Sequence, residues 1–175
     1  MAFWNFFTKA EKQKKKAANL YKSVVALSRN QDLFIGMNIE DSVDGRFNSI
    51  TLHLSLILRR LKKEGNSLRG VAIDLVSIFV MDMDRNLREM GVGDLSVGKH
   101  IKKMTSAFYG RAEAYEKALE SNENDEISGA LKRNLYKDQE IPKDKLESMV
   151  KYVYETDIKF KNLKGEDLKN GLLLI

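Results

Sequence analysis

The sequence predicts an all-α fold, an irregular bundle of five to six helices. The chain has 175 residues, which suits one domain with one core. It contains a single proline, Pro142, so long helices can run without interruption. Apolar residues recur at intervals of three and four, and we find no strand-like alternation and no internal repeat. Hydrophobic residues make up 43% and charged residues 31%, as in ordinary globular proteins.

Residues 1–16 form an aromatic and basic N-terminal arm. Residues 9–16 contain five lysines and one glutamate, a local charge of +4, so the rest of the +5 chain carries only +1. The residues expected to contact a membrane or ribosome are Phe3, Trp4, Phe6, Phe7, Lys12, Lys14, Lys15 and Lys16. In one interpretation, the rings lie at the headgroup level of a membrane and the lysines contact anionic lipid. In another, the lysines contact phosphates of a ribosome. A disordered start whose aromatics pack on the domain is the simpler alternative.

No segment has the roughly 20 apolar residues of a membrane span, and the start lacks a secretory signal or a convincing transit peptide. We therefore expect a cytoplasmic protein, with the arm allowing peripheral attachment to the inner membrane.

The helical domain is predicted to cover residues 17–162. Its first helix spans 17–29, and residues 30–45 have loop composition, typical of a functional loop or a packed cap. The next helix ends at Gly65 and buries one stripe, Phe47, Ile50, Leu54, Ile57 and Leu61. His53 flanks this stripe, and we interpret it as a hydrogen-bonded core histidine rather than a ligand.

Two long helices follow, separated by Gly91 and Gly93. The first spans 67–90, with the predicted buried stripe Ala72, Val76, Phe79, Met83, Leu87 and Met90. The second begins at a cap, Asp94 or Ser96, and its stripe is Val97, Ile101, Met104, Phe108, Ala112, Tyr115 and Leu119.

The remaining chain is predicted to hold an acidic connector at 121–126 and a weaker helix at 127–137. Pro142 then opens a last helix with Leu146, Met149, Val150 and Val153 inward. Residues 163–175 form a tail, turn-rich to residue 171, whose final Leu-Leu-Leu-Ile is either docked in a groove or an exposed liability.

Most enzyme and metal chemistries are disfavoured by composition. The chain has no cysteine and only two histidines, far apart, so we expect no metal and no cofactor. Residues 93–99 match the first seven positions of a phosphate-binding loop, but His100 replaces the Ser or Thr that binds magnesium, and a helix precedes it where a strand should. The lysines lack an RNA-binding fold, so site-specific recognition of nucleic acid is not expected.

A carboxylate–arginine cluster lies near the end of the 67–90 helix. Asp84–Arg88 and Arg85–Glu89 are i,i+4 pairs, which predicts a salt-bridged helix face. Asp82 and Asp84 point about 200° apart, so they should not share a ligand.

Gly110 within a helix suggests close approach of another helix or a ligand. We expect Arg111 to reach a carboxylate of the 67–90 helix, Asp82 or Glu89.

Several segments together resemble the ubiquinol–cytochrome c chaperone family, assembly factors for cytochrome b and the respiratory bc1 complex. They are Ser42-Val-Asp-Gly-Arg-Phe47, Asp82-Met-Asp84, Leu87-Arg-Glu-Met-Gly-Val-Gly-Asp-Leu95, Val97-Gly-Lys99 and Ala107-Phe-Tyr-Gly-Arg111. The similarity spans roughly Leu20 to Leu119 and implies an all-helical, non-catalytic protein that works with a small partner protein. Without a transit peptide, the chain is identified as a bacterial member.

Three functional hypotheses follow. The first is a non-enzymatic chaperone that binds newly made cytochrome b or another bc1 component. The second is a peripheral membrane or ribosome-associated adaptor without chaperone activity. The third is an enzyme that uses the carboxylate–arginine cluster on a phosphorylated or quinone substrate. The residues predicted to bind client or partner are Arg46, Phe47, Asp82, Asp84, Arg88, Glu89, Asp94, Lys99, Tyr109 and Arg111.

Overall fold

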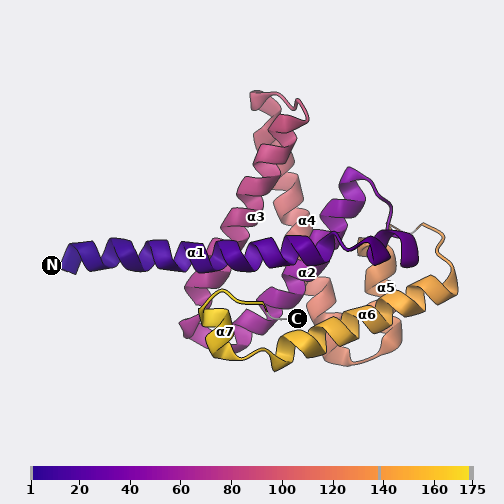
Figure 1. The fold of residues 1–175 in the computed structure, drawn as a ribbon. Coiled ribbons are helices and arrows are strands. Elements are labelled where there is room, and N and C mark those ends of the chain that lie inside the picture. Colours follow the sequence, from indigo (N-terminus) through magenta and orange to yellow (C-terminus); the bar gives the residue numbers. More distant parts are fainter. Residues whose placement is uncertain (1, 138, 174–175) are drawn as a thin grey trace. The chain divides into compact units, whose positions relative to one another are not determined.

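The computed structural model describes residues 2–137 and 139–173, with side chains described from residue 10 onward. Six long helices carry the labels of Figure 1: α1 (Ala2–Ser28), α2 (Val43–Lys63), α3 (Arg69–Glu89), α4 (Asp94–Ser121), α5 (Asn124–Asn134) and α6 (Lys143–Asn162). Shorter elements are the π-helical turn η1 (Asp32–Gly36), the 3-10 turn η2 (Gly65–Ser67) and α7 (Gly165–Lys169). No strand occurs among the described residues, so the predicted all-α class is confirmed.

The first helix begins much earlier than predicted. We expected a start at residue 17, but α1 begins at Ala2 and runs through the basic segment. The chain has no glycine or proline before Gly36, and alanine and lysine are good helix formers, which explains the extension. Lys12, Lys14 and Lys15 are exposed, whereas Lys16 is half-buried. The side chains of the four predicted contact aromatics lie outside the described residues.

The described chain divides into two compact units. One contains residues 2–23, 61–107 and 163–173, and the other contains residues 24–60 and 108–162. The predicted division into arm, domain and tail remains a prediction.

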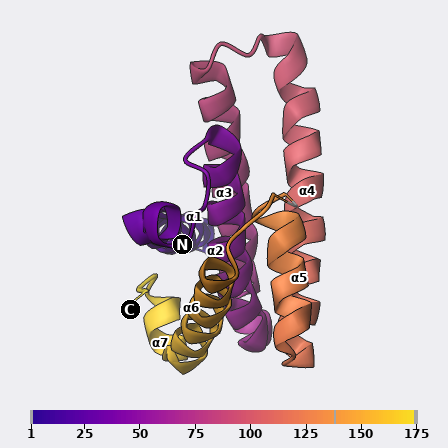
Figure 2. The same ribbon diagram turned by 90° about the vertical axis from the view of Figure 1, so that its right-hand side faces the viewer.

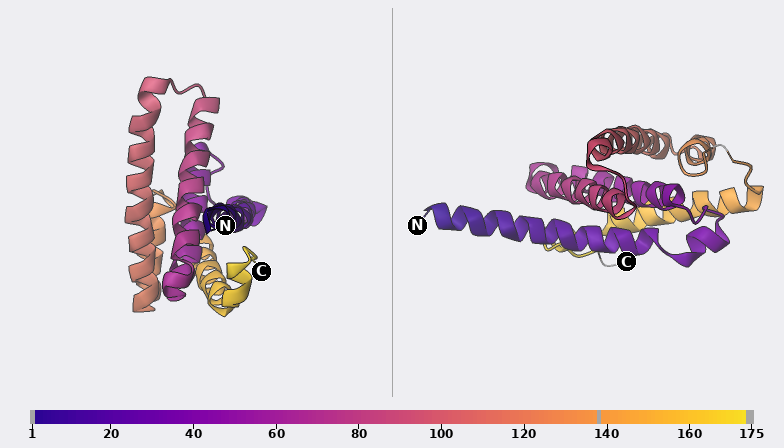
Figure 3. Two further views of the ribbon diagram at one scale, coloured as in Figure 1. Left: turned by 90° about the vertical axis from the view of Figure 1, so that its left-hand side faces the viewer. Right: turned by 90° about the horizontal axis from the view of Figure 1, so that it is seen from above.

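In the first unit, α3 and the beginning of α4 form an antiparallel hairpin closed by residues 90–93 (Figures 2 and 3). The α3 side chains that are buried are Val71, Leu75, Phe79 and Leu87. The predicted stripe is therefore correct at Phe79 and Leu87, but Ala72, Val76 and Met83 are only half-buried. The prediction that Met90 is buried is wrong, because this residue follows the last helical turn and is 51% exposed.

The C-terminal tail is packed rather than simply turn-rich. It contains α7, and Leu163 and Leu168 on either side of that helix's start are buried. Gly171 has φ +74°, and a Cβ there would lie 2.7 Å from the Lys16 carbonyl oxygen, so only glycine fits. Leu172 is exposed, and Leu174 and Ile175 lie outside the described residues.

Most of α2, residues 43–60, belongs to the second unit. Its predicted stripe is confirmed, since Phe47, Ile50, Leu54, Ile57 and Leu61 are all buried. Leu52 and Leu56 on other sides of the helix are also buried, so this segment is surrounded rather than amphipathic. Two of its buried polar groups are hydrogen-bonded to neighbours: Asn48 Nδ2 donates to the Leu135 carbonyl (3.1 Å), and Ser49 Oγ donates to that of Ser28 (2.8 Å).

The segment 30–45 is a packed cap that includes η1. Leu33 and Ile39 are buried, and the Tyr136 hydroxyl donates to the Met37 carbonyl at 2.7 Å. These contacts confirm that the segment is packed as a cap, whereas a functional role for it stays a prediction.

The last two long helices follow the prediction with one shift. α5 begins at Asn124 rather than at residue 127, because the carboxylates of Asp125 and Glu126 in its first turn interact favourably with the positive end of the helix dipole. The acidic connector before it is therefore shorter than predicted. Pro142 directly precedes α6, and the predicted inward residues Leu146, Met149, Val150 and Val153 are all buried. Among the described residues, we find no helix with the length and apolar content needed to cross a membrane.

Candidate functional site

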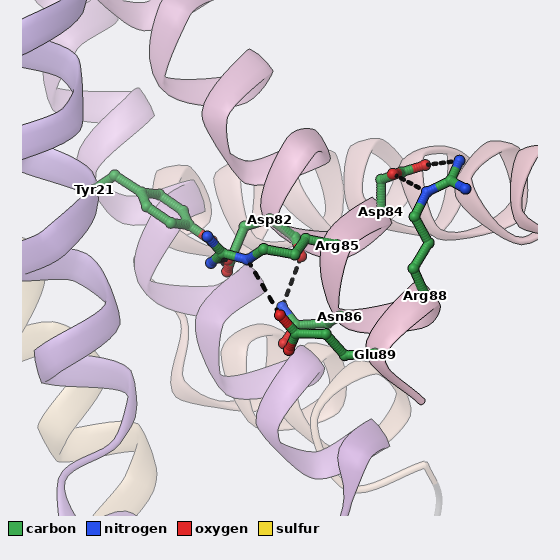
Figure 4. Close-up of polar contacts among 7 residues, drawn as sticks. All are labelled: Tyr21, Asp82, Asp84, Arg85, Asn86, Arg88 and Glu89. Carbon is green, nitrogen blue, oxygen red and sulfur yellow. Dashed lines mark hydrogen bonds and ion pairs between the residues drawn. The ribbon is translucent and has the colours of Figure 1, made fainter. Parts of the chain in front are cut away.

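One polar cluster joins α1 to α3 in the first unit. The Tyr21 hydroxyl donates to Asp82 Oδ2 at 2.8 Å, and Arg85 donates to the other oxygen of the same carboxylate (Figure 4). Arg85 also lies 3.9 Å from Glu89, a pair the sequence predicted. The Asp82 side chain is 14% exposed, whereas those of Arg85 and Glu89 are mostly in solvent. Both carboxylate oxygens of Asp82 are therefore bonded within the chain, and this side chain links α1 to α3.

A second cluster spans the turn between α3 and α4. Arg88 Nε donates to Asp84 Oδ2 at 2.6 Å, as predicted, and Nη1 of the same arginine pairs with Asp94. The hydrogen bond that Arg88 donates to Asp84 is the main cause that raises the pKa of Arg88 above its ordinary value. All three side chains are substantially exposed, so solvent and salt screen both ion pairs and weaken their contribution to stability. Asp82 and Asp84 belong to different clusters, which agrees with their predicted separation.

Arg111 and the carboxylates of α3 belong to different compact units, so the expected pairing of Arg111 with Asp82 or Glu89 stays a prediction. Within the first unit, Asp82 is held by Tyr21 and Arg85, and Glu89 lies 3.9 Å from Arg85. The Arg111 guanidinium lies over the Phe47 ring, 5.2 Å from its centroid. Among the described residues, its buried Nη1 has no hydrogen-bond acceptor. Within the second unit, Arg111 therefore makes a cation–π contact with α2, a helix not considered in the prediction.

The other candidates are dispersed on the surface. Arg46 Nε lies 2.7 Å from Asp41 Oδ1; this hydrogen bond raises the arginine pKa and lowers the aspartate pKa. Tyr109 is 56% exposed, with its ring tilted against Phe108 at 5.2 Å between centroids. Lys99 is exposed. Gly110 is also exposed, and beyond its chain neighbours and the backbone of its own helix nothing described lies within 4 Å of where its Cβ would be, so the described residues provide no close neighbour there.

His53 is the core histidine that the sequence suggested. It is fully buried, and Nδ1 lies 2.8 Å from the Ser49 carbonyl oxygen while Nε2 lies 2.7 Å from the Tyr152 hydroxyl. A carbonyl can only accept, so Nδ1 carries the proton and Nε2 accepts from the tyrosine. Burial lowers the pKa of His53 to about 4, although the bond to Ser49 opposes this shift.

A buried ion-pair network in the second unit escaped the sequence analysis. Arg59 Nη1 donates to Asp157 Oδ1 at 2.8 Å, and Lys161 Nζ lies 2.6 Å from Oδ2. The side chains of Arg59 and Asp157 are only 12% and 5% exposed. The i,i+4 spacing of Asp157 and Lys161 was the available signal, but nothing in the sequence shows that Arg59 on α2 completes the network.

The carboxylates and arginines of α3 form ion pairs with one another at the surface. Among the described residues, we find no group of three or more His, Asp or Glu side chains that could hold a metal ion. A pocket of about 640 Å³ is lined by other residues, Lys132 and Gln139 to Pro142.

Replacing Tyr21 with phenylalanine should destabilise the chain modestly. The Asp82 carboxylate would lose its hydrogen bond to α1, and a hydrogen bond to a charged group is worth about 1.5–3 kcal/mol. Urea denaturation measures this loss. The matched variant Tyr109→Phe changes an exposed hydroxyl and should stay within about 0.5 kcal/mol of wild type. Equal stability of the Tyr21 variant and wild type would contradict the role of this bond.

Known proteins with similar sequences are assembly factors. Ubiquinol-cytochrome c reductase complex assembly factor 1 of Mus musculus is 26% identical over 152 residues, covering 87% of this chain and 51% of its own length. The Xenopus laevis protein is 27% identical, and the match covers 87% of this chain and 76% of that protein. The Homo sapiens protein is also 27% identical, and the match covers 87% of this chain and 50% of that protein. The chain thus spans about half the length of the mouse and human relatives.

A solved structure and a family model agree with these matches. The crystal structure of the Cbp3 homolog from Brucella abortus superposes with a TM-score of 0.85 and 30% sequence identity, over 98% of this chain and 94% of that one. This similarity to a bacterial protein supports the predicted bacterial placement. The family model described as ubiquinol-cytochrome C chaperone matches residues 36–174, which include all the site candidates outside the arm. The chain therefore belongs to the ubiquinol-cytochrome c chaperone family.

Proposed function

We propose that this protein is a non-enzymatic assembly chaperone for the bc1 complex, ubiquinol-cytochrome c reductase. Its client would be newly made cytochrome b or another component of that complex. The observation that carries the proposal is the family match over residues 36–174, reinforced by relatives whose names describe assembly of this complex. The site chemistry is compatible, because its charged groups are arranged as surface ion pairs rather than around a buried nucleophile or base.

The client or partner surface is proposed to include the exposed candidates. These are Asp84, Arg88, Glu89 and Asp94 at the closed end of the α3–α4 hairpin, with Lys99 and Tyr109 along α4. Asp82 and Phe47 are better suited to holding the fold, since Asp82 joins two helices and Phe47 is buried under Arg111. Arg46 remains available despite its pair with Asp41, because both side chains are mostly in solvent.

The basic arm is proposed to bring the chaperone to its client. Its exposed lysines, Lys12, Lys14 and Lys15, suit an anionic membrane or a ribosome surface. A small partner protein is a further proposed interaction. We propose a location in the cytoplasm with peripheral attachment to the inner membrane, and no cofactor.

The same exposed lysines also favour a second candidate, an adaptor that attaches to the membrane or ribosome without chaperone activity. The enzyme hypothesis has less support, because the carboxylates and arginines it requires are already paired with one another.

Affinity purification of the full chain from detergent-solubilised membranes tests the proposal. Cytochrome b or another bc1 subunit should copurify, and a strain lacking the protein should lose most of its spectroscopically detected cytochrome b. The adaptor hypothesis predicts normal cytochrome b in that strain. Normal assembly together with no copurified bc1 subunit would refute the chaperone function.

A further inference from the structure

The outward face of α4 combines unpaired positive charge with exposed apolar side chains. Residues spaced by three and four lie on one side of a helix, which groups Leu95, Lys99, Lys102, Ser106 and Tyr109. All five side chains are exposed, whereas Val97 and Phe108 on the other side of the helix are buried. We call the five residues, together with neighbouring Lys103, the α4 outer face.

The charge on this face is uniformly positive. Lys99, Lys102 and Lys103 are exposed, and no aspartate or glutamate occurs from residue 95 to residue 112. The flanking acids are already paired, Asp94 with Arg88 and Glu113 with Lys117. Within the described ranges, none of the three lysines has a carboxylate within ion-pair distance. Their attraction for an external anionic surface is therefore not cancelled by a neighbour on the same helix.

The two ends of the face are apolar or aromatic. Leu95 is fully exposed, at 102%, and Met90 at the preceding turn is 51% exposed. Tyr109 marks the other end, and the helical rise places it about 21 Å along the axis from Leu95. A large exposed leucine forgoes the stabilisation of burial, so a site that covers it gains that free energy. Apolar and aromatic anchors with lysines between them are typical of helices that lie in a membrane interface, where lysine stems extend toward the headgroups.

We propose that the α4 outer face docks on an anionic lipid bilayer, with the lysines on the headgroups and Leu95 and Tyr109 dipping into the interface. This surface is distinct from the arm, whose membrane contact is part of the proposed function. Lipid fits better than RNA, because leucine and methionine at the hairpin end have no role in binding phosphates, and no aromatic ring stands between the lysines for bases to stack on. Beyond chain neighbours and the backbone of α4 itself, nothing described lies within 4 Å of the Cβ positions of Gly98 and Gly110, so the helix is open there.

Co-flotation of the purified full chain with vesicles tests the inference. The wild type should bind phosphatidylcholine vesicles containing phosphatidylglycerol, bind pure phosphatidylcholine weakly, and lose binding as salt rises. Each lysine near an anionic surface contributes about fivefold to binding, so the triple variant Lys99→Gln, Lys102→Gln and Lys103→Gln should bind about 100-fold more weakly. Leu95→Ser should weaken binding more than tenfold, and this loss should persist at high salt.

Two matched variants separate this face from general charge and from the arm. Lys132→Gln, Lys143→Gln and Lys159→Gln remove the same charge from exposed positions on α5 and α6 and should retain binding. Lys12→Gln, Lys14→Gln and Lys15→Gln test the arm. Circular dichroism verifies that each variant is folded. The inference is overturned if the α4 variant binds like wild type, if only the arm variant loses binding, or if the wild type cross-links to RNA or an acidic protein but does not float. Copurification of cytochrome b is measured in detergent, so either proposal can fail without the other.

Discussion

Replacing Asp157 with alanine is expected to destabilise the protein by about 3–5 kcal/mol, because it leaves buried positive charge without a partner. Asp157 accepts two hydrogen bonds from Arg59 Nη1, at 2.8 and 3.1 Å, and pairs with Lys161 at 2.6 Å. The Arg59 side chain is only 12% exposed, so water cannot replace the lost carboxylate without structural rearrangement. Thermal and urea denaturation of the variant measure the loss.

Glu155 on the same helix provides a matched control. It pairs with Lys151 at 3.9 Å, and both side chains are mostly exposed. Glu155→Ala should therefore change stability by less than about 1 kcal/mol. If the two alanine variants were equally stable, the buried network would not have the importance we assign to it.

Acid should destabilise the folded chain through His53. Its pKa is lowered to about 4 in the folded state, against about 6.5 when unfolded, so the unfolded state binds more protons between these values. The contribution of neutral His53 is complete above about pH 6.5 and is lost progressively as pH falls toward about 4. The total loss is about 3 kcal/mol, because the pKa of His53 falls from 6.5 to about 4 on folding.

Urea denaturation of wild type and His53→Gln across this pH range isolates the effect from the carboxylates. Glutamine can donate and accept hydrogen bonds but does not titrate, so the stability difference between the two proteins should shrink as pH falls. The control His100→Gln replaces the exposed second histidine, and the dependence of its stability on pH should match that of wild type. Parallel pH profiles for wild type and His53→Gln would refute the assignment.

The fold was predictable where one helix buries a clear stripe. The spacing of Phe47, Ile50 and Leu54 identified the core face of α2, and Pro142 marked the start of α6. The sequence did not show that α2 is buried on its other sides, since Leu52 and Leu56 could equally have faced solvent. The start of α1 was missed because apolar periodicity begins only near residue 17, whereas helix propensity extends the helix to Ala2.

The candidate site was predictable within a helix and not between helices. Fixed i,i+4 spacing gave the pairs Asp84–Arg88 and Arg85–Glu89. The choice of partner for Arg111 depended on which element packs beside α4, which spacing along one helix does not contain. The Tyr21–Asp82 and Arg59–Asp157 contacts, separated by 61 and 98 positions, were missed for the same reason.

Each compact unit is assembled from separate segments of the sequence, and this restricts how binding sites can be mapped. Within the described residues the chain passes from one unit to the other after residues 23, 60, 107 and 162, and the first three passages lie inside α1, α2 and α4. Neither unit is a continuous stretch of sequence, so no truncation or single proteolytic cut yields an intact one. A fragment carrying only the α3–α4 hairpin would lack the residues of α1 and α7 that belong to its own unit. Interaction surfaces of this protein must therefore be mapped by point substitution or site-specific crosslinking in the full chain, and negative results from fragments carry no weight.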